Sequence, residues 1–322
     1  MNRKKSAVVI ALALTLGLLT QSALAAYPEK PITWIVPWPA GGRTDIVSRI
    51  FASVLEKTVG QPVLVVNKPG AGGVLGAKEL AAANPDGYTL SQFSTAVVLT
   101  QYIVPTPTNL KDYIPVARLF AFPALLSVHS KSPWSTMKEF LEYARANPEK
   151  LKNAHAGVGS SDHMVGASFQ KAAGVKFIQV PYTGDAPAVA ALAGRHVDCN
   201  FAPMAAVKAF VTAGDLRVLG VSSEKRRSLY PHIPTWKEQG VNVNLAPIEG
   251  IFLPAGTPAN IVSVLEKALV KVSQDAEVIS KMNNLGVELE FENHKDFIKK
   301  VAETDAAVRQ LVDELGLRVP PR

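Results

Sequence analysis

Residues 32–45 read ITWIVPWPAGGRTD, and this segment carries the clearest signal of the fold class. Its apolar start, Ile32–Val36, is typical of a buried strand, and Pro37 ends that strand. A helix is predicted after Gly41 and Gly42, because apolar residues then recur at the spacing of one helix face, at Ile46, Val47, Ile50, Phe51, Val54 and Leu55. The stretch therefore supplies a strand, a glycine-rich loop and a helix, which together form the basic unit of an α/β fold.

The same alternation continues along the chain. Short apolar runs predict strands at residues 63–66, 88–93, 125–128, 177–180, 197–201 and 216–221. Helices are predicted at residues 75–83, after the capping box of Thr136 and Glu139, from Pro258 as a first helical residue, and from the cap Asn293 to Gly316. Alternating strands and helices with short links predict parallel sheets. A chain of 322 residues fits two domains of about 150 residues each.

The first 26 residues have the pattern of a secretory signal peptide. The basic residues Arg3, Lys4 and Lys5 precede an apolar run at residues 7–19, and small residues at 22–26 offer a cleavage site. The apolar run is shorter than the roughly 20 residues of a membrane-spanning helix, which leaves an uncleaved anchor as the lesser alternative. We therefore predict export of the protein to the periplasm.

The distribution of charge and the number of cysteines limit the possible partners and the possible cysteine chemistry of the protein. The formal net charge is +7, but the basic residues are scattered, so no nucleic-acid partner is predicted. Cys199 is the one cysteine of the chain, which excludes an intramolecular disulfide. Its position in a predicted strand indicates a buried small side chain, with a catalytic thiol as the lesser alternative.

Three loops that follow predicted strands are rich in glycine, at residues 39–45, 157–162 and 182–187. Ligands of open α/β sheets bind beyond the carboxyl ends of the strands, where glycine permits close approach and helix N-termini attract anions. These loops are therefore a candidate anion site, although ordinary tight turns explain each loop taken alone. The glycines of a fourth loop, residues 69–76, miss the spacing of a dinucleotide motif, so no cofactor is predicted.

Enzyme signatures are weak in this sequence. No G-x-S-x-G elbow and no H-E-x-x-H motif is present, so neither a hydrolase site nor a metal site is predicted. A secreted serine hydrolase stays a remote alternative, because Ser160 and Ser161 lie near Asp162, His155 and His163. A helix cap beside a hydrogen-bonded histidine explains the same residues, since adjacency in sequence is not triad geometry. We therefore predict a protein that is not an enzyme.

Nine short motifs follow one another across the rest of the chain. The first third carries YPxKPI from Tyr27, VPxPAGGxTD from Val36, GQPV from Gly60, NxPGAGG from Asn67 and NPDGYTL from Asn84. The remainder carries GVGSSxH from Gly157, VPYxGxxPA from Val180, GxxVD from Gly194 and PAGTP from Pro254. In this order the motifs resemble those of the substrate-binding receptors of tripartite tricarboxylate transporters, also called Bug-type receptors.

The resemblance implies a periplasmic binding-protein fold, in which two α/β domains are joined by two crossing strands and enclose a ligand cleft. The crossings are expected near residues 125–130 and 245–252. Domain 1 would comprise residues 27–125 and 250–322, and domain 2 would comprise residues 126–249. The implied function is capture of a small organic carboxylate, as a monomer, for the membrane permease subunits of a transporter. The alternative partner is the ectodomain of a signalling receptor, for which the protein would sense the ligand.

The same resemblance implies which residues contact the ligand. They are Ala40, Gly41, Gly42, Arg43, Asp45 and Ser94 in domain 1 and His155, Gly159, Ser160, Ser161, His163, Tyr182, Gly184 and Asp185 in domain 2. Asp45 is expected to orient its loop, and Arg43, His155 and Asp185 stand where small or hydroxylated residues are usual. Two interpretations of Asp185 stay open: an N-cap of the following helix, or a cleft-facing carboxylate that disfavours dicarboxylate ligands.

Overall fold

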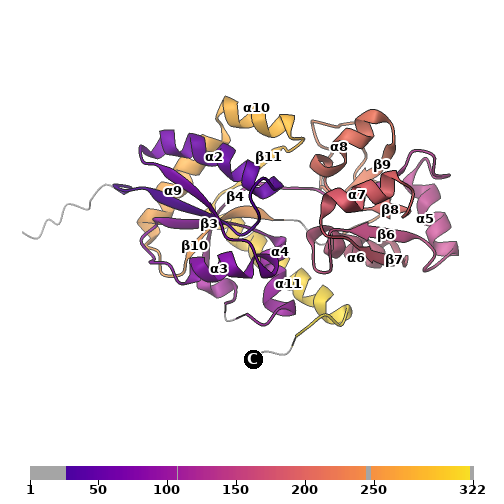
Figure 1. Ribbon diagram of the computed structural model, residues 1–322, viewed down its shortest axis with the longest axis horizontal. Coiled ribbons are helices and arrows are strands. Elements are labelled where there is room, and N and C mark those ends of the chain that lie inside the picture. The colour runs from indigo at the N-terminus through magenta and orange to yellow at the C-terminus, as the bar shows by residue number, and fades with distance from the viewer. Residues whose placement is uncertain (1–26, 107, 244–247, 320–322) are drawn as a thin grey trace, which may run out of the picture.

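The computed structural model describes residues 27–106, 108–243 and 248–319, so the predicted signal peptide lies outside the described residues. Two β-sheets with helices on their faces lie side by side along the long axis of the molecule (Figure 1). The predicted α/β class and periplasmic binding-protein fold are confirmed. We call the six-stranded sheet with its helices the first lobe, and the five-stranded sheet with its helices the second lobe.

The first lobe is built on a sheet with the strand order β11-β4-β10-β3-β1-β2. Its strands are β1 Ile32–Val36, β2 Val63–Asn67, β3 Thr89–Ser94, β4 Tyr113–Phe120, β10 Glu249–Pro254 and β11 Leu289–Glu292. The strands β1, β2 and β3 pair in parallel, whereas β10 and β11 pair with their neighbours in antiparallel fashion. The expectation of parallel sheets is therefore wrong for half of this sheet.

The second lobe has the strand order β7-β6-β8-β5-β9. Its strands are β5 Leu125–His129, β6 Lys152–His155, β7 Ile178–Pro181, β8 Cys199–Asn200 and β9 Leu216–Val221. Only β6 makes parallel pairs, with β7 and β8, and β5 is antiparallel to both of its neighbours. The antiparallel strands β5 and β10 both enter their sheets from the other lobe, without the helical crossover that parallel neighbours require.

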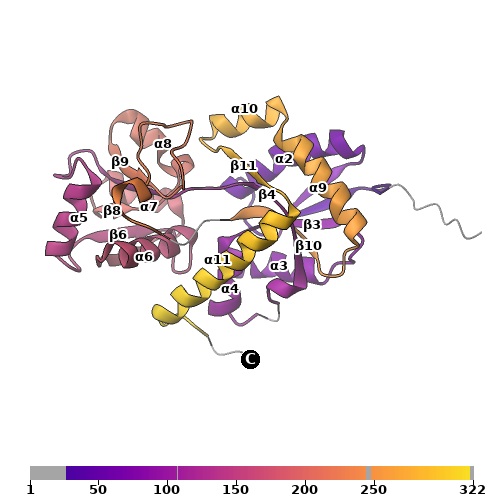
Figure 2. The ribbon, with the colours of Figure 1, turned by 180° about the vertical axis from the view of Figure 1, so that it is seen from behind.

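Helices cover both faces of each sheet (Figures 1 and 2). In the first lobe, α2 Arg43–Val59, α9 Ala259–Ser273 and α10 Ala276–Asn284 pack together on one face, and α3 Val74–Ala81, α4 Thr95–Ile103 and α11 His294–Glu314 lie on the other. The helices of the second lobe are α5 Met137–Ala146, α6 Ser161–Ala173, α7 Asp185–Ala193 and α8 Met204–Ala213. None of the helices in the described ranges is long and apolar enough to cross a membrane.

Most of the helix signals in the sequence mark helix ends in the structure. Thr136 and Glu139 form the predicted capping box of α5, and Asn293 caps α11 through the Asp296 N–H. Pro258, the predicted first helical residue, is the N-cap of α9, so the helix begins one position later at Ala259. The apolar stripe predicted on α2 is buried at four of its six positions. Ile46 is 41% exposed, so the buried face of the helix is narrower than predicted.

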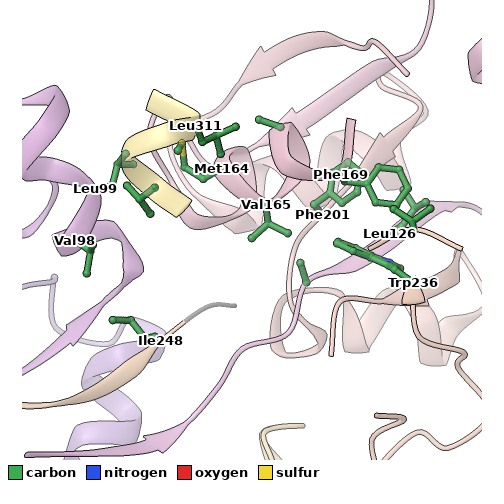
Figure 3. Packing of buried hydrophobic residues seen from close by; sticks show 14 of the residues in the cluster. Val98, Leu99, Leu126, Met164, Val165, Phe169, Phe201, Trp236, Ile248 and Leu311 are labelled. Carbon is green, nitrogen blue, oxygen red and sulfur yellow. The ribbon is translucent and has the colours of Figure 1, made fainter. Parts of the chain in front are cut away.

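A shared hydrophobic core joins the two lobes on one side. Leu99 of α4 and Leu311 of α11 pack with Met164 of α6 in one cluster of buried residues (Figure 3). The described segment between β4 and β5 is residues 121–124, so the first crossing lies a few residues before the expected 125–130. The second expected crossing includes residues 244–247, which lie outside the described residues.

Candidate functional site

A cavity of about 600 Å³ is lined by residues of both lobes. From the first lobe come Gly42, Arg43, Ser94 and Glu249, and from the second lobe come the loops 156–162 and 183–185. The apolar part of the wall includes Trp38, Ile103, Phe122, Val165 and Phe201. A cavity of this size, with an apolar wall and a few polar groups, is typical of a small-molecule site.

Four helix N-termini meet at this cavity, because the first residues of α2, α4, α6 and α7 or their N-caps line it. Side chains cap two of them: the Ser94 hydroxyl accepts from the Ala96 N–H, and the Ser160 hydroxyl accepts from the His163 N–H. The N-caps of α2 and α7 are Gly42 and Gly184, and neither helix has a side-chain cap. One helix from each lobe thus presents first-turn N–H groups that an anion can satisfy.

Asp45 holds the loop before α2 in shape. Its buried carboxylate accepts hydrogen bonds from the Gly41 N–H at 2.8 Å, the Asn67 amide at 2.9 Å and Arg49 at 3.2 Å. Burial alone would raise the pKa of the Asp45 carboxyl, but these hydrogen bonds outweigh burial and lower it. Gly41 has a φ of +76°, which favours glycine at this turn. Asp45 therefore orients the loop from behind the cavity wall.

Arg43 and Asp185 form an ion pair across the cavity. The Nη1 atom of Arg43 lies 3.3 Å from Oδ2 of Asp185, and the guanidinium carbon lies 4.0 Å from the centre of the Phe122 ring. The Nε atom of Arg43 is buried and has no hydrogen-bond partner among the described residues. Burial raises the pKa of the Asp185 carboxyl, and the nearby Arg43 guanidinium opposes that shift.

Asp185 is the first residue of α7, and the N-cap position belongs to Gly184. The N-cap interpretation of Asp185 is therefore wrong, because a cap must precede the first helical residue and no side-chain cap is formed at this helix. The Asp185 carboxylate instead lines the cavity and faces Arg43.

Glu249 is a cavity residue that the sequence interpretation missed. It opens β10, is 4% exposed, and accepts a hydrogen bond from the Gln92 amide at 3.3 Å. Burial raises the pKa of its carboxyl to about 7, although Arg43, Gln92 and Arg118 all favour the ionised form. An acidic residue at the edge of the apolar run Ile251–Leu253 was the available signal, since a buried acid in such a run is rarely structural alone.

The serines and histidines of the second lobe do not form a catalytic triad. The Ser160 hydroxyl donates to the Gly157 carbonyl at 2.7 Å, while Nδ1 of His155 contacts the same carbonyl and Nδ1 of His163 accepts from the Gly159 N–H. Both histidines are buried, and burial lowers the pKa of His155 and brings that of His163 to about 4. Neither ring is hydrogen-bonded to a serine hydroxyl in the described part of the chain. These residues shape the loop.

Eight of the fourteen predicted ligand residues line the cavity: Gly42, Arg43, Ser94, Gly159, Ser160, Ser161, Gly184 and Asp185. The other six do not line it: Ala40, Gly41, Asp45, His155, His163 and Tyr182. Of these six, Asp45, His155, His163 and Tyr182 hold the loops through hydrogen bonds, the last from its N–H to the His155 carbonyl.

Cys199 is fully buried in β8 and unpaired, as predicted, and burial raises the pKa of its thiol. Within residues 27–106, 108–243 and 248–319, no group of histidine, cysteine and acidic side chains has the arrangement of a metal site.

Residues 47–317 match the family described as "Tripartite tricarboxylate transporter family receptor". The chain is 32% identical over 285 residues to the protein BugT of Bordetella pertussis, and this match covers 87% of each chain. The resemblance of the nine motifs to Bug-type receptors is thereby confirmed.

Solved structures of the same kind superimpose on nearly the whole chain. A TctC solute-binding protein from Polaromonas is 32% identical, with a TM-score of 0.81 over 89% of this chain and 99% of that one. The protein Rpa4515 of R. palustris with adipate is 28% identical, with a TM-score of 0.77 over 90% and 98% of the chains. MatC of Rhodopseudomonas palustris with bound malate is also 28% identical, with a TM-score of 0.74 over 89% and 100%.

Proposed function

The chain belongs to the tripartite tricarboxylate transporter receptor family, and from this premise we propose that it captures a small organic carboxylate in the cavity between its lobes. Members of the family are periplasmic solute-binding proteins and not enzymes, which removes the serine hydrolase as an alternative. The proposal extends to the periplasm as the location and to the permease subunits of a tripartite transporter as the partner.

The observation that carries the proposal is the pair of uncapped helix N-termini at one cavity. The first turns of α2 and α7 belong to different lobes, and neither has a side-chain cap. A carboxylate between them would accept hydrogen bonds from N–H groups that otherwise have no partner within their helix. The positive ends of both helix dipoles would favour the same negative charge. The malate-bound and adipate-bound neighbours support an organic acid as the ligand class.

We further propose that the ligand closes the two lobes around itself. Domain 1, residues 27–125 and 250–322, then corresponds to the first lobe, and domain 2, residues 126–249, to the second. The exceptions are Leu125, which belongs to β5 of the second lobe, and Glu249, which belongs to β10 of the first. A ligand that contacts both lobes binds the closed arrangement more tightly than the open one, so it shifts the population toward closure. A ligand in the cavity would contact both lobes, because the wall includes Gly42 and Arg43 of the first lobe and Gly184 and Asp185 of the second.

A thermal-shift screen of the purified protein tests the proposal. The panel comprises mono-, di- and tricarboxylates and aromatic acids, with sugars and simple amines as controls. A ligand that binds only the folded state at a hundredfold excess over Kd adds about 2.7 kcal/mol to the free energy of unfolding, so at least one acid should raise Tm clearly. A screen in which only sugars or simple amines raise Tm would overturn the proposal. Uptake in a strain without the permease separates transport from sensing.

A further inference from the structure

We propose that this receptor selects a zwitterionic ligand, with one carboxylate and one protonated amine, and that Asp185 and Glu249 receive the amine. The inference rests on the proposed function, because it names the ligand class of the same cavity. It assigns a specificity role to Glu249, which no motif of the family resemblance contained, and to Asp185.

The charge balance of the cavity wall is the first argument. Among the described residues that line the cavity, Arg43 is the one basic side chain, against the three acids Asp162, Asp185 and Glu249. Asp162 already accepts a hydrogen bond from the Ala156 N–H at 2.8 Å and holds its loop. Asp185 and Glu249 both interact electrostatically with Arg43. Glu249 also interacts with Arg118, but that guanidinium already pairs with Glu290 and Glu292. A cation is therefore the partner that this side of the cavity lacks.

The geometry of Arg43 is the second argument. Its ion pair with Asp185 is a single contact at 3.3 Å, whereas charge-assisted hydrogen bonds of this type are usually about 2.7–2.9 Å long. The Arg43 guanidinium packs over the Phe122 ring. The buried Nε donor of Arg43 has no hydrogen-bond partner among the described residues. A zwitterion can satisfy both partners at once. Its carboxylate takes the unpaired Arg43 donor and the first-turn N–H groups of α2 and α7, and its ammonium contacts the Asp185 carboxylate.

Burial of Glu249 is the third argument. The side chain is 4% exposed and has the Gln92 amide as its hydrogen-bond donor, yet it stands at the cavity wall. A buried carboxylate is stabilised by a cation held close to it, because the low local dielectric strengthens their attraction. A second carboxylate of a diacid beside Asp185 or beside Glu249 would meet repulsion from that side chain. This distinguishes the cavity from one that suits the diacids bound by the malate and adipate neighbours.

Matched ligand pairs test the inference by isothermal titration calorimetry. Each pair exchanges a carboxylate for an amine at similar length: succinate with 3-aminopropanoate, glutarate with 4-aminobutanoate, and terephthalate with 4-(aminomethyl)benzoate. The protein variants are Asp185→Asn, Glu249→Gln and, as a control with the same charge change, Glu142→Gln on the exposed face of α5. We expect the amine member of at least one pair to bind more tightly than its diacid.

Asp185→Asn should then weaken binding of the amine about tenfold to hundredfold, the usual loss for a charge-assisted hydrogen bond, and should leave or improve binding of the diacid. Glu249→Gln should shift the preference in the same direction, and Glu142→Gln should shift nothing. Tighter binding of diacids by the wild type, or an unchanged preference in Asp185→Asn, would overturn the inference while leaving carboxylate capture intact. Absence of binding by every acid tested here and in the thermal screen would instead remove the proposed function itself.

Discussion

Arg43 of α2 and Asp185 of α7 are 142 positions apart in the chain, yet their side chains meet at 3.3 Å across the cavity between the lobes. Each residue lies in the first turn of its helix, directly after the glycine that forms the N-cap. The same two helix ends that attract an anion thus also bring one positive and one negative side chain to the site.

Replacement of Arg43 by methionine should weaken carboxylate binding about tenfold to hundredfold, because the ligand loses a charged donor. The two side chains are 31% and 28% exposed, so loss of their ion pair should cost no more than about 1 kcal/mol of folding stability. Calorimetry measures the affinity and chemical denaturation measures the stability. Lys138→Met, at a side chain that is 85% exposed, is the control and should change neither. Full affinity in Arg43→Met would show that Arg43 does not contact the ligand.

Replacement of Gly42 by valine should weaken binding at least tenfold, because the new side chain lies at the cavity wall over the first turn of α2. The backbone at Gly42 has φ −73° and ψ 164°, which valine adopts without strain. A Cβ atom there would lie 3.2 Å from the Pro39 carbonyl oxygen, so a small shift of the loop suffices. We therefore expect nearly unchanged Tm without ligand. Retention of the ligand-induced Tm rise by the variant would contradict the placement of the anion at α2.

The affinity for an amine-bearing acid should rise between pH 6 and pH 8. Glu249 has a pKa of about 7 without ligand, because burial outweighs the favourable effects of Arg43, Gln92 and Arg118. A bound ammonium stabilises the ionised Glu249 and lowers this pKa, so binding releases a proton and becomes tighter as pH increases. A diacid would raise the pKa of Glu249 and bind more tightly as pH decreases. Calorimetry in buffers of different ionisation enthalpy measures the proton directly.

Glu249→Gln is the control for this pH dependence, since the glutamine side chain has no titratable group. The slope of log Kd against pH should be close to zero around pH 7 in this variant. Proton uptake on binding of the amine, in place of release, would contradict the role given to Glu249.

A second ionic contact between the lobes should matter for stability. Arg227 follows β9 of the second lobe, its side chain is 7% exposed, and it forms ion pairs with Glu288 and with Glu290 of β11 in the first lobe. Arg227→Met should lower the free energy of unfolding by about 1–3 kcal/mol, because Glu288 loses its cation and Glu290 keeps only its ion pair with Arg118. The neighbouring Arg226 pairs with Glu238 at an exposed site, so Arg226→Met should cost less than about 1 kcal/mol. Equal losses in both variants would contradict this account.

The sequence predicted those parts of the fold that depend on local signals. The capping residues Thr136 and Asn293 fix helix starts through hydrogen bonds to neighbouring residues, so their roles can be predicted from the local sequence alone. The strands β4 and β11 were missed because Pro115 interrupts the first and Glu290 and Glu292 give the second a polar composition. Their pairing with each other, through which Arg118 meets those two acids, is a long-range contact that no local pattern contains.

The site was predictable to a similar extent. Glycine-rich loops identified where helix N-termini meet, and the cavity lies there. The sequence did not show that Asp185 faces Arg43, because that contact depends on how the two lobes are placed. Glu249 was missed for the same reason. It lies within residues 245–252, which were expected to cross between the domains, and its partners are Gln92 of β3 and, electrostatically, Arg43 of α2.

A crystal structure of the protein with a bound acid from the thermal screen would show which groups hold the carboxylate. We expect one carboxylate in the cavity, with its oxygens within hydrogen-bond distance of first-turn N–H groups of α2 in the first lobe and α7 in the second. We also expect the distance between the Arg43 guanidinium and the Asp185 carboxylate to change, because contacts with the ligand replace the contact between these two side chains. An acid bound outside the cavity, or held by one lobe alone, would contradict the claim.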